Sequence, residues 1–156
     1  YEAGLLLCQI FATLVSIRHP REATVERSVG KRGRTVYVDY LQNILGIEAQ
    51  VRRAQQQNPR QANALSVKTE LQADCFAGIW ANRSQQAKSW LEQGDIESAM
   101  NAAARIGDDA LQKRSQGYAV PDSFTHGSSA QRRRWFAQGF KNGSVQACDT
   151  FNAQGL

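Results

Sequence analysis

The stretch that most constrains the fold is Glu70–Trp80, which combines a helical pattern of apolar residues with two carboxylates. Glu70 and Asp74 are four residues apart, so a helix places both carboxylates on one face, a single turn from each other. Like charges at that spacing are unfavourable unless a cation, an arginine or a proton lies between them. On pattern alone, a solvated acidic edge on a core helix is favoured over a chemical site. The apolar stripe of this helix consists of Leu71, Cys75, Phe76, Ile79 and Trp80.

Helical spacing of apolar residues recurs along the chain and predicts a mainly α fold with about five helices. One segment differs, because Arg34–Tyr40 alternates between apolar and polar residues, as a half-buried strand does. It follows a basic turn, Gly30–Gly33, whose glycines suit a hairpin. We therefore expect one β-hairpin near residues 23–40. The predicted helices cover residues 3–18, 41–57, 61–90, 95–106 and 128–142, with a further short helix expected after Asp109.

Several polar residues predict where the helices begin. Asp95 is expected to cap one helix, and the adjacent acids Asp108 and Asp109 are expected to cap the next, in preference to binding a cation. Ser128 and Gln131 have the spacing of a capping box, in which each side chain accepts a hydrogen bond from the backbone of the other. The sequence therefore predicts three helix starts in the second half of the chain.

A basic run precedes Trp135 in the last predicted helix. Arg132, Arg133 and Arg134 are expected to face outward at least in part, whereas Trp135 has the spacing of a buried side chain. Basic and aromatic groups together bind phosphates and stack on bases, and the net charge of +5 permits such contacts without requiring them. The aromatic spacing favours a charged helix face above a core over a nucleic-acid site.

Two further features limit the class of protein. The apolar stretch Leu5–Ile17 contains polar residues and follows no basic residue, so we expect neither a signal peptide nor a membrane span in this chain. The three cysteines are an odd number and form no C-x-x-C pair, which argues against a structural zinc knot. These cysteines are Cys8, Cys75 and Cys148.

Residues 42–154 contain a series of short sequence motifs that together resemble the neutral zinc metallopeptidases of bacteria. In that family the Glu of the Glu-Leu-Gln-Ala-Asp motif is the third zinc ligand, which the resemblance assigns to Glu70, with Asp74 as the residue that orients this ligand. The family's other two ligands come from a His-Glu-x-x-His helix just upstream. The matching motifs are Gln42-Asn43, Leu45–Ile47, Val51-Arg52, Glu70–Gly78, Gly94–Glu97, Ile106–Asp109, Val120–Gly127 and Cys148–Phe151.

The helix that should supply those two ligands is missing from the sequence. A zinc peptidase of this type needs two imidazoles on one helix face, a glutamate between them as general base and a third ligand. The only two histidines, His19 and His126, are far apart, and Thr35–Leu41 stands where the motif is expected. His126 lies in one of the motifs that resemble the peptidase family, but a lone histidine is more often structural than metal-bound. The family's activity therefore does not carry over to this sequence as it stands.

The first part of the chain resembles a different family, the primase-like polymerase domain of bacterial DNA ligase D. The resemblance covers residues 1–46, and its most specific part is Ala23–Asn43. It implies that Asp39 is one of three metal-binding carboxylates, but its two companions are absent, and a lone carboxylate cannot hold two metal ions. We therefore expect a chimera, with a ligase D polymerase-like fragment at residues 1–41 and a metallopeptidase-like helical subdomain at residues 42–156.

The peptidase resemblance also bears on two of the cysteines. Cys75 and Cys148 both lie in peptidase-like motifs and would form a disulfide in an exported domain. Buried free thiols in a reducing cytoplasm are an equally good interpretation. The two resemblances also disagree on localisation, because the peptidase family suggests the cell envelope and the ligase fragment suggests the cytoplasm.

These observations lead to one expected function and two alternatives. We expect an inactive zinc metallopeptidase-like protein that keeps Glu70 as an orphan ligand and does not bind zinc tightly. The first alternative is an active peptidase that completes its site in trans and only then accepts a peptide substrate. The second is a nucleic-acid-binding fragment of the ligase D type, whose contacts would come from Lys31, Arg32 and Arg34.

Overall fold

The computed structural model describes residues 42, 45–89 and 91–156. Within these residues the chain forms five α-helices and three short 3-10 helices and no β-strand, so the mainly α class is confirmed. The predicted hairpin near residues 23–40 and the predicted helix over residues 3–18 lie outside the described residues. The elements are α4 Ile47–Gln57, η1 Pro59–Gln61, α5 Ala62–Lys88, α6 Asp95–Arg105, α7 Asp108–Gln116, η2 Pro121–Ser123, α8 Ser129–Asn142 and η3 Val145–Cys148.

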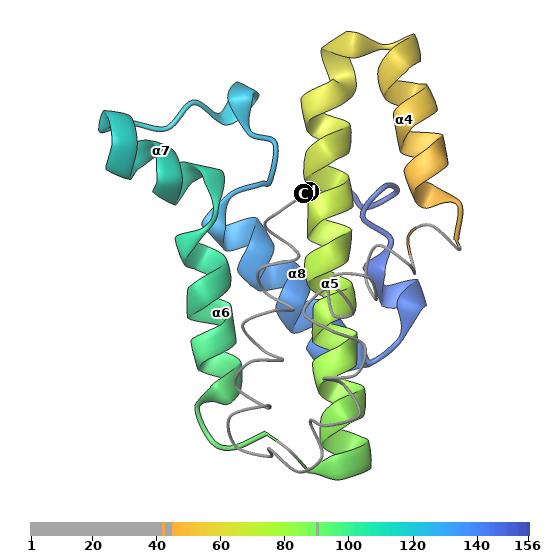
Figure 1. Ribbon diagram of the computed structural model, residues 1–156, viewed down its shortest axis with the longest axis vertical. Coiled ribbons are helices and arrows are strands. Elements are labelled where there is room, and N and C mark those ends of the chain that lie inside the picture. Colours follow the sequence, from red (N-terminus) through yellow and green to blue (C-terminus); the bar gives the residue numbers. More distant parts are fainter. Residues whose placement is uncertain (1–41, 43–44, 90) are drawn as a thin grey trace, which may run out of the picture.

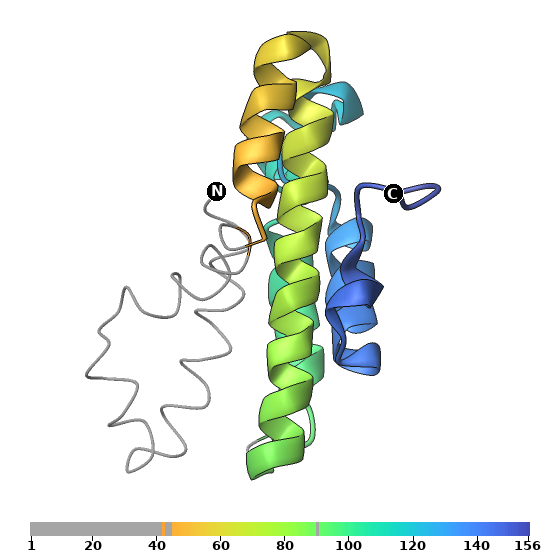
Figure 2. The same cartoon turned by 90° about the vertical axis from the view of Figure 1, so that its right-hand side faces the viewer.

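The long helix α5 is the central element, and α4 and α8 pack directly on it (Figure 1). Helix α4 ends before the turn at η1, where Pro59 cannot continue it, and the chain then runs back alongside α4 as the first half of α5. Helix α8 makes the most extensive packing with α5, and α6 packs on α8. Figure 2 shows α8 and the C-terminal segment on one side of α5, away from α4. The apolar stripe of Glu70–Trp80 is therefore covered by elements that follow it in the sequence.

The core consists mainly of small and medium-sized apolar side chains. Leu71 and Phe136 are its largest fully buried apolar residues, and they come from α5 and α8. Ala99 and Ala103 of α6 complete the core where α6 packs on α8. Small side chains let the helix backbones approach closely, which is how short helices bury enough surface. The buried apolar set is Val67, Leu71, Ala73, Cys75, Phe76, Ala77, Ala81, Ala99, Ala103, Trp135, Phe136 and Cys148.

Two glycines allow α5 and α8 to cross at backbone contact. A Cβ atom on Gly139 would lie 1.9 Å from the carbonyl oxygen of Cys75, and one on Gly78 would lie 2.2 Å from the carbonyl oxygen of Phe136. Real carbon and oxygen atoms that are not bonded do not approach so closely, so only hydrogen fits at either position. The crossing therefore determines which residues of α8 face α5.

Replacing Gly139 with alanine is expected to destabilise the protein by about 3 kcal/mol, because the new methyl group forces α8 away from α5. Alanine is the better helix former by about 1 kcal/mol, so the steric cost has to exceed that gain. Urea unfolding measures the difference. Gln138→Ala, at the exposed neighbouring position, should change stability by less than about 0.5 kcal/mol. A Gly139→Ala protein as stable as the parent would show that the helices do not touch there.

Several predicted helix starts differ from the structure. Helix α4 begins at Ile47, not at residue 41, because Gly46 precedes it with φ of 70°, a left-handed conformation that glycine tolerates. Gly94 stands at the N-cap of α6, and Asp95 instead accepts a 2.9 Å hydrogen bond from the backbone N–H of Glu92. The capping box of α8 is confirmed, since Ser128 and Gln131 exchange hydrogen bonds of 2.7 and 3.2 Å.

The described helices also bear on a membrane location. In the part of the chain that the structure describes, none of the helices is both long enough and apolar enough to cross a membrane.

Candidate functional site

Helix α5 carries the two carboxylates that the sequence singles out, and both are buried. Glu70 is 7% exposed and Asp74 is 0% exposed. The favoured pattern-based interpretation, a solvated acidic edge, is therefore wrong. A buried carboxylate requires a partner because transfer of a charge from water into the protein is costly. Asp74 has such a partner on α8.

Asp74 and Arg132 form a two-pronged ion pair between α5 and α8. Arg132 Nε donates to Asp74 Oδ2 at 2.7 Å, and Nη2 donates to Oδ1 at 2.6 Å. Both side chains are 0% exposed. Arg132 was expected to face outward at least in part, and the structure corrects this. The reason is the crossing of the helices, because Arg132 shares a face of α8 with Phe136 and Gly139, at spacings of four and seven residues.

The charges around this pair act on one another. Burial raises the pKa of Asp74 to about 6, and the negative charge of Glu70 adds to the rise, while the hydrogen bonds and charge of Arg132 and the charge of His126 oppose it. Burial also lowers the pKa of Arg132, but the hydrogen bonds and charge of Asp74 outweigh that effect and raise it above its ordinary value. Both groups are therefore mainly charged at neutral pH.

Asp108 organises the loop that carries His126. Its Oδ2 accepts three backbone N–H groups, from Thr125 at 2.7 Å, His126 at 2.7 Å and Gly127 at 3.1 Å. Its Oδ1 lies 3.1 Å from His126 Nδ1. Asp108 was expected to cap α7, but Gly107 stands at the N-cap and Asp108 is the first residue of the helix. The acid instead holds the loop before α8 in place.

Asp109 has a similar role at the start of α8. The backbone N–H and the hydroxyl of Ser129 both lie 2.7 Å from Asp109 Oδ1. Slight burial raises the pKa of Asp109, but the hydrogen bonds from Ser129 outweigh it and hold the pKa below its ordinary value. The adjacent acids therefore fasten the start of α7 to the loop before α8 and to the start of α8.

These residues do not fit a zinc centre. Both oxygens of Asp74 accept hydrogen bonds from Arg132, and His126 directs its Nδ1 to Asp108 and to the hydroxyl of Thr125, 3.0 Å away. Across residues 42, 45–89 and 91–156, no three His, Cys, Asp or Glu side chains gather in a way that could hold a metal ion. Zinc sites in proteins take three or four such ligands. The assignment of Glu70 as a zinc ligand stays a prediction.

Other predicted site residues lie outside the described part of the chain. They are Asp39, the carboxylate of the polymerase type, and the basic residues Lys31, Arg32 and Arg34. Their roles stay predictions. Among the described residues, sequence reasoning missed Arg132 and the loop-holding role of Asp108. The spacing of Arg132, Phe136 and Gly139 on one helix face is the signal that points to Arg132.

The C-terminal segment is fastened to the same region of α5. Cys75 and Cys148 are joined by a disulfide, the pair named from the peptidase resemblance, with buried free thiols as the alternative. Hydrogen bonds continue the attachment, because Thr150 Oγ1 donates to the carbonyl oxygen of Lys68 at 2.7 Å and Lys68 Nζ donates to that of Phe151 at 3.0 Å. The stretch of α5 with Glu70 and Asp74 is therefore held from two directions, by α8 and by residues 148–151.

Comparison with known proteins associates this geometry with one family. A family model described as "Putative neutral zinc metallopeptidase" matches residues 37–151. The uncharacterized protein YpfJ of Escherichia coli K12 is 57% identical over 114 residues, which cover 72% of this chain and 39% of the relative. The uncharacterized protein Rv2575 of Mycobacterium tuberculosis H37Rv is 40% identical over 129 residues, which cover 77% of this chain and 43% of the relative. No solved structure gives a significant match.

The matches bear on the expected chimera. They support the metallopeptidase resemblance over most of the chain and give no support to the resemblance to DNA ligase D. The family match begins at residue 37, so it includes residues 37–41, which the sequence prediction assigned to the ligase-like fragment. The chain spans less than half the length of these curated relatives.

Proposed function

Because the chain belongs to the neutral zinc metallopeptidase family, we propose that it is an inactive peptidase-like protein with an incomplete zinc site. Glu70 is the one residue that the family resemblance assigns to zinc, and no His-Glu-x-x-His motif occurs in the 156 residues. A single carboxylate binds zinc weakly, and without the motif the general base for water attack is also missing.

The observation that carries this proposal is the ion pair of Asp74 with Arg132. A carboxylate one turn from Glu70 is the nearest candidate for a second ligand, but both its oxygens are used by the guanidinium. Zinc would have to displace a fully buried two-pronged pair to recruit it, and the freed Arg132 would then repel the ion. The polar centre of this helix pair supports a structural role for Asp74.

One observation supports a second candidate, a peptidase whose site is completed in trans. The curated relatives are more than twice as long as the part of them that this chain matches. Ligands from another chain would then be needed beside Glu70, and a peptide would be the substrate. The basic run before Trp135 gives no support to a nucleic-acid site, because Arg132 is buried against Asp74 and cannot reach a phosphate. The residues of the ligase-type alternative, Lys31, Arg32 and Arg34, lie outside the described part of the chain, so that alternative stays a prediction.

Zinc calorimetry on the parent chain and on Glu70→Gln tests the proposal. We expect weak binding or none, unchanged by the substitution, because one carboxylate does not make a zinc site. Glu97→Gln, at an exposed glutamate of α6, is the matched control for the loss of one negative charge. Tight one-to-one binding that is lost in Glu70→Gln and kept in Glu97→Gln would contradict it. Peptidase activity that rises steeply with protein concentration and stops with a chelator would replace it by completion in trans.

A further inference from the structure

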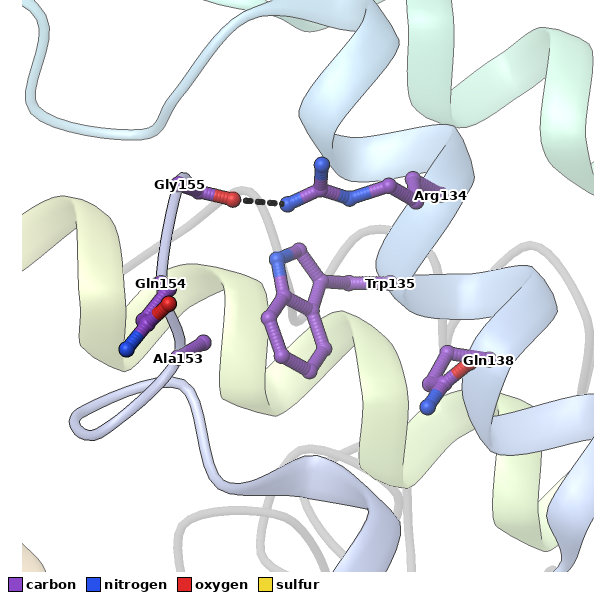
Figure 3. A pocket seen from close by; sticks show the side chains of 6 residues that line it. All are labelled: Arg134, Trp135, Gln138, Ala153, Gln154 and Gly155. Atoms are coloured by element: carbon purple, nitrogen blue, oxygen red, sulfur yellow. Dashed lines mark hydrogen bonds between the residues drawn. The ribbon is translucent and has the colours of Figure 1, made fainter.

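A small pocket lies between α8 and the C-terminal segment (Figure 3). Its volume is about 220 Å³. None of the described residues that line it is acidic, so none of them brings a negative charge to its wall. The lining residues are Arg134, Trp135, Gln138, Ala153, Gln154 and Gly155.

The wall of this pocket holds a buried hydrogen-bond donor that lacks an acceptor. The Trp135 side chain is 7% exposed, and its Nε1–H is shielded from solvent and makes no hydrogen bond within the described residues. Indole nitrogen can only donate, and buried donors in native proteins almost always have a partner. Such a group therefore indicates a missing acceptor at this place.

Arg134 adds a second donor beside the first. Its guanidinium carbon lies 5.8 Å from the centre of the Trp135 ring, and its Nη2 donates to the carbonyl oxygen of Gly155 at 2.8 Å. Figure 3 shows the indole nitrogen on the edge of the ring that faces this hydrogen bond. The Gly155 carbonyl is therefore taken by the arginine and not by the indole, which leaves the indole donor beside a positive charge.

We propose that this pocket binds a carboxylate group, with one oxygen on the indole N–H of Trp135 and the other on the guanidinium of Arg134. A carboxylate has two oxygens in one plane and a single negative charge, which matches one arginine and one neutral donor. The arriving oxygen takes the place of the Gly155 carbonyl on Arg134. This site is independent of the proposed function, because it uses none of the residues around Glu70.

The carboxylate has two sources, a free small molecule or the C-terminus of a peptide. The pocket volume admits either, and the same two donors would hold both. A short peptide with a free C-terminus and the same peptide with a C-terminal amide separate the charge from the rest of the ligand. Acetate then tests whether the carboxylate alone is enough.

Nuclear magnetic resonance of the indole N–H groups tests the proposal. The sequence has three tryptophans, Trp80, Trp90 and Trp135, so three indole signals are expected, and Trp135→Phe identifies the third. Titration with acetate and with the free-acid tripeptide should move only the Trp135 proton downfield, to saturation, and the amide tripeptide should not. Arg134→Gln should weaken the affinity at least about tenfold, whereas Arg133→Gln, its exposed neighbour, should keep it.

Three results would overturn the proposal. The first is no saturable movement of the Trp135 signal with any carboxylate up to about 50 mM, since weaker binding is not specific recognition. The second is equal movement of all three indole signals, which is an effect of salt. The third is the same affinity in Arg134→Gln as in the parent. If acetate fails and the free-acid peptide succeeds, the source is a peptide C-terminus.

Discussion

Replacing Arg132 with methionine is expected to cost about 3–5 kcal/mol of stability at neutral pH, because it leaves the carboxylate of Asp74 buried without a counter-charge. Arg132 and Asp74 are both fully buried and joined by two hydrogen bonds. Methionine fills much of the same space, so the loss reports the charge and its hydrogen bonds more than a cavity. Chemical unfolding of the two proteins measures it.

The pH dependence of that loss identifies its cause. In the parent the pKa of Asp74 is raised to about 6 from 3.8, so its stabilising protonation is complete below 3.8 and is lost as the pH rises through about 6. Without Arg132, which lowers that pKa, the carboxyl keeps its proton to a higher pH, and stability goes on falling above pH 6. The gap between the two proteins should therefore be larger at pH 8 than at pH 5.

Two further variants control this experiment. Arg133→Met removes a neighbouring arginine that is exposed, and it should change stability by less than about 0.5 kcal/mol. Combining Arg132→Met with Asp74→Leu removes both charges and should recover most of the loss, because no buried charge remains. Equal costs for Arg132→Met and Arg133→Met, or a cost that does not change with pH, would refute this account of the pair.

Loss of the disulfide is expected to be the other large effect, at about 4 kcal/mol. The bridge joins Cys75 and Cys148, which are 73 residues apart, so it restricts a long stretch of the unfolded chain. We expect Cys75→Ala combined with Cys148→Ala to unfold at a correspondingly lower urea concentration. Double substitution avoids leaving a single reactive thiol in the core.

Reduction of the parent protein is the matching control. The reduced parent should approach the stability of the double variant, and the double variant should not respond to the reductant. If the parent unfolds at the same urea concentration with and without reductant, the bridge does not stabilise the fold.

The course of α5 could be predicted from sequence because its signal is local. Leu71, Cys75 and Phe76 recur at the spacing of one helix face, and the structure buries all three. The capping box of Ser128 and Gln131 is local in the same way, since its two members are three residues apart. Features whose interacting residues lie within one helical turn can be predicted without knowledge of the tertiary structure.

The surroundings of Asp74 could not be predicted in this way. Its partner Arg132 is 58 residues away, and an arginine in a basic run has the pattern of an exposed residue. What overrides that pattern is the close crossing at Gly78 and Gly139, which turns one face of α8 towards α5. A family resemblance located Glu70 and Asp74, but the partner of Asp74 emerges only when the two helices are packed.

The bridge between Cys75 and Cys148 also changes the covalent topology of the molecule. Together with the backbone between them it closes a ring that contains α6, α7 and α8. A protease that cuts the exposed turn after α7 opens this ring but releases no fragment, because both pieces stay tied through the sulfur atoms. The nicked molecule gains only the mass of one water, and it separates into two chains only when the disulfide is reduced.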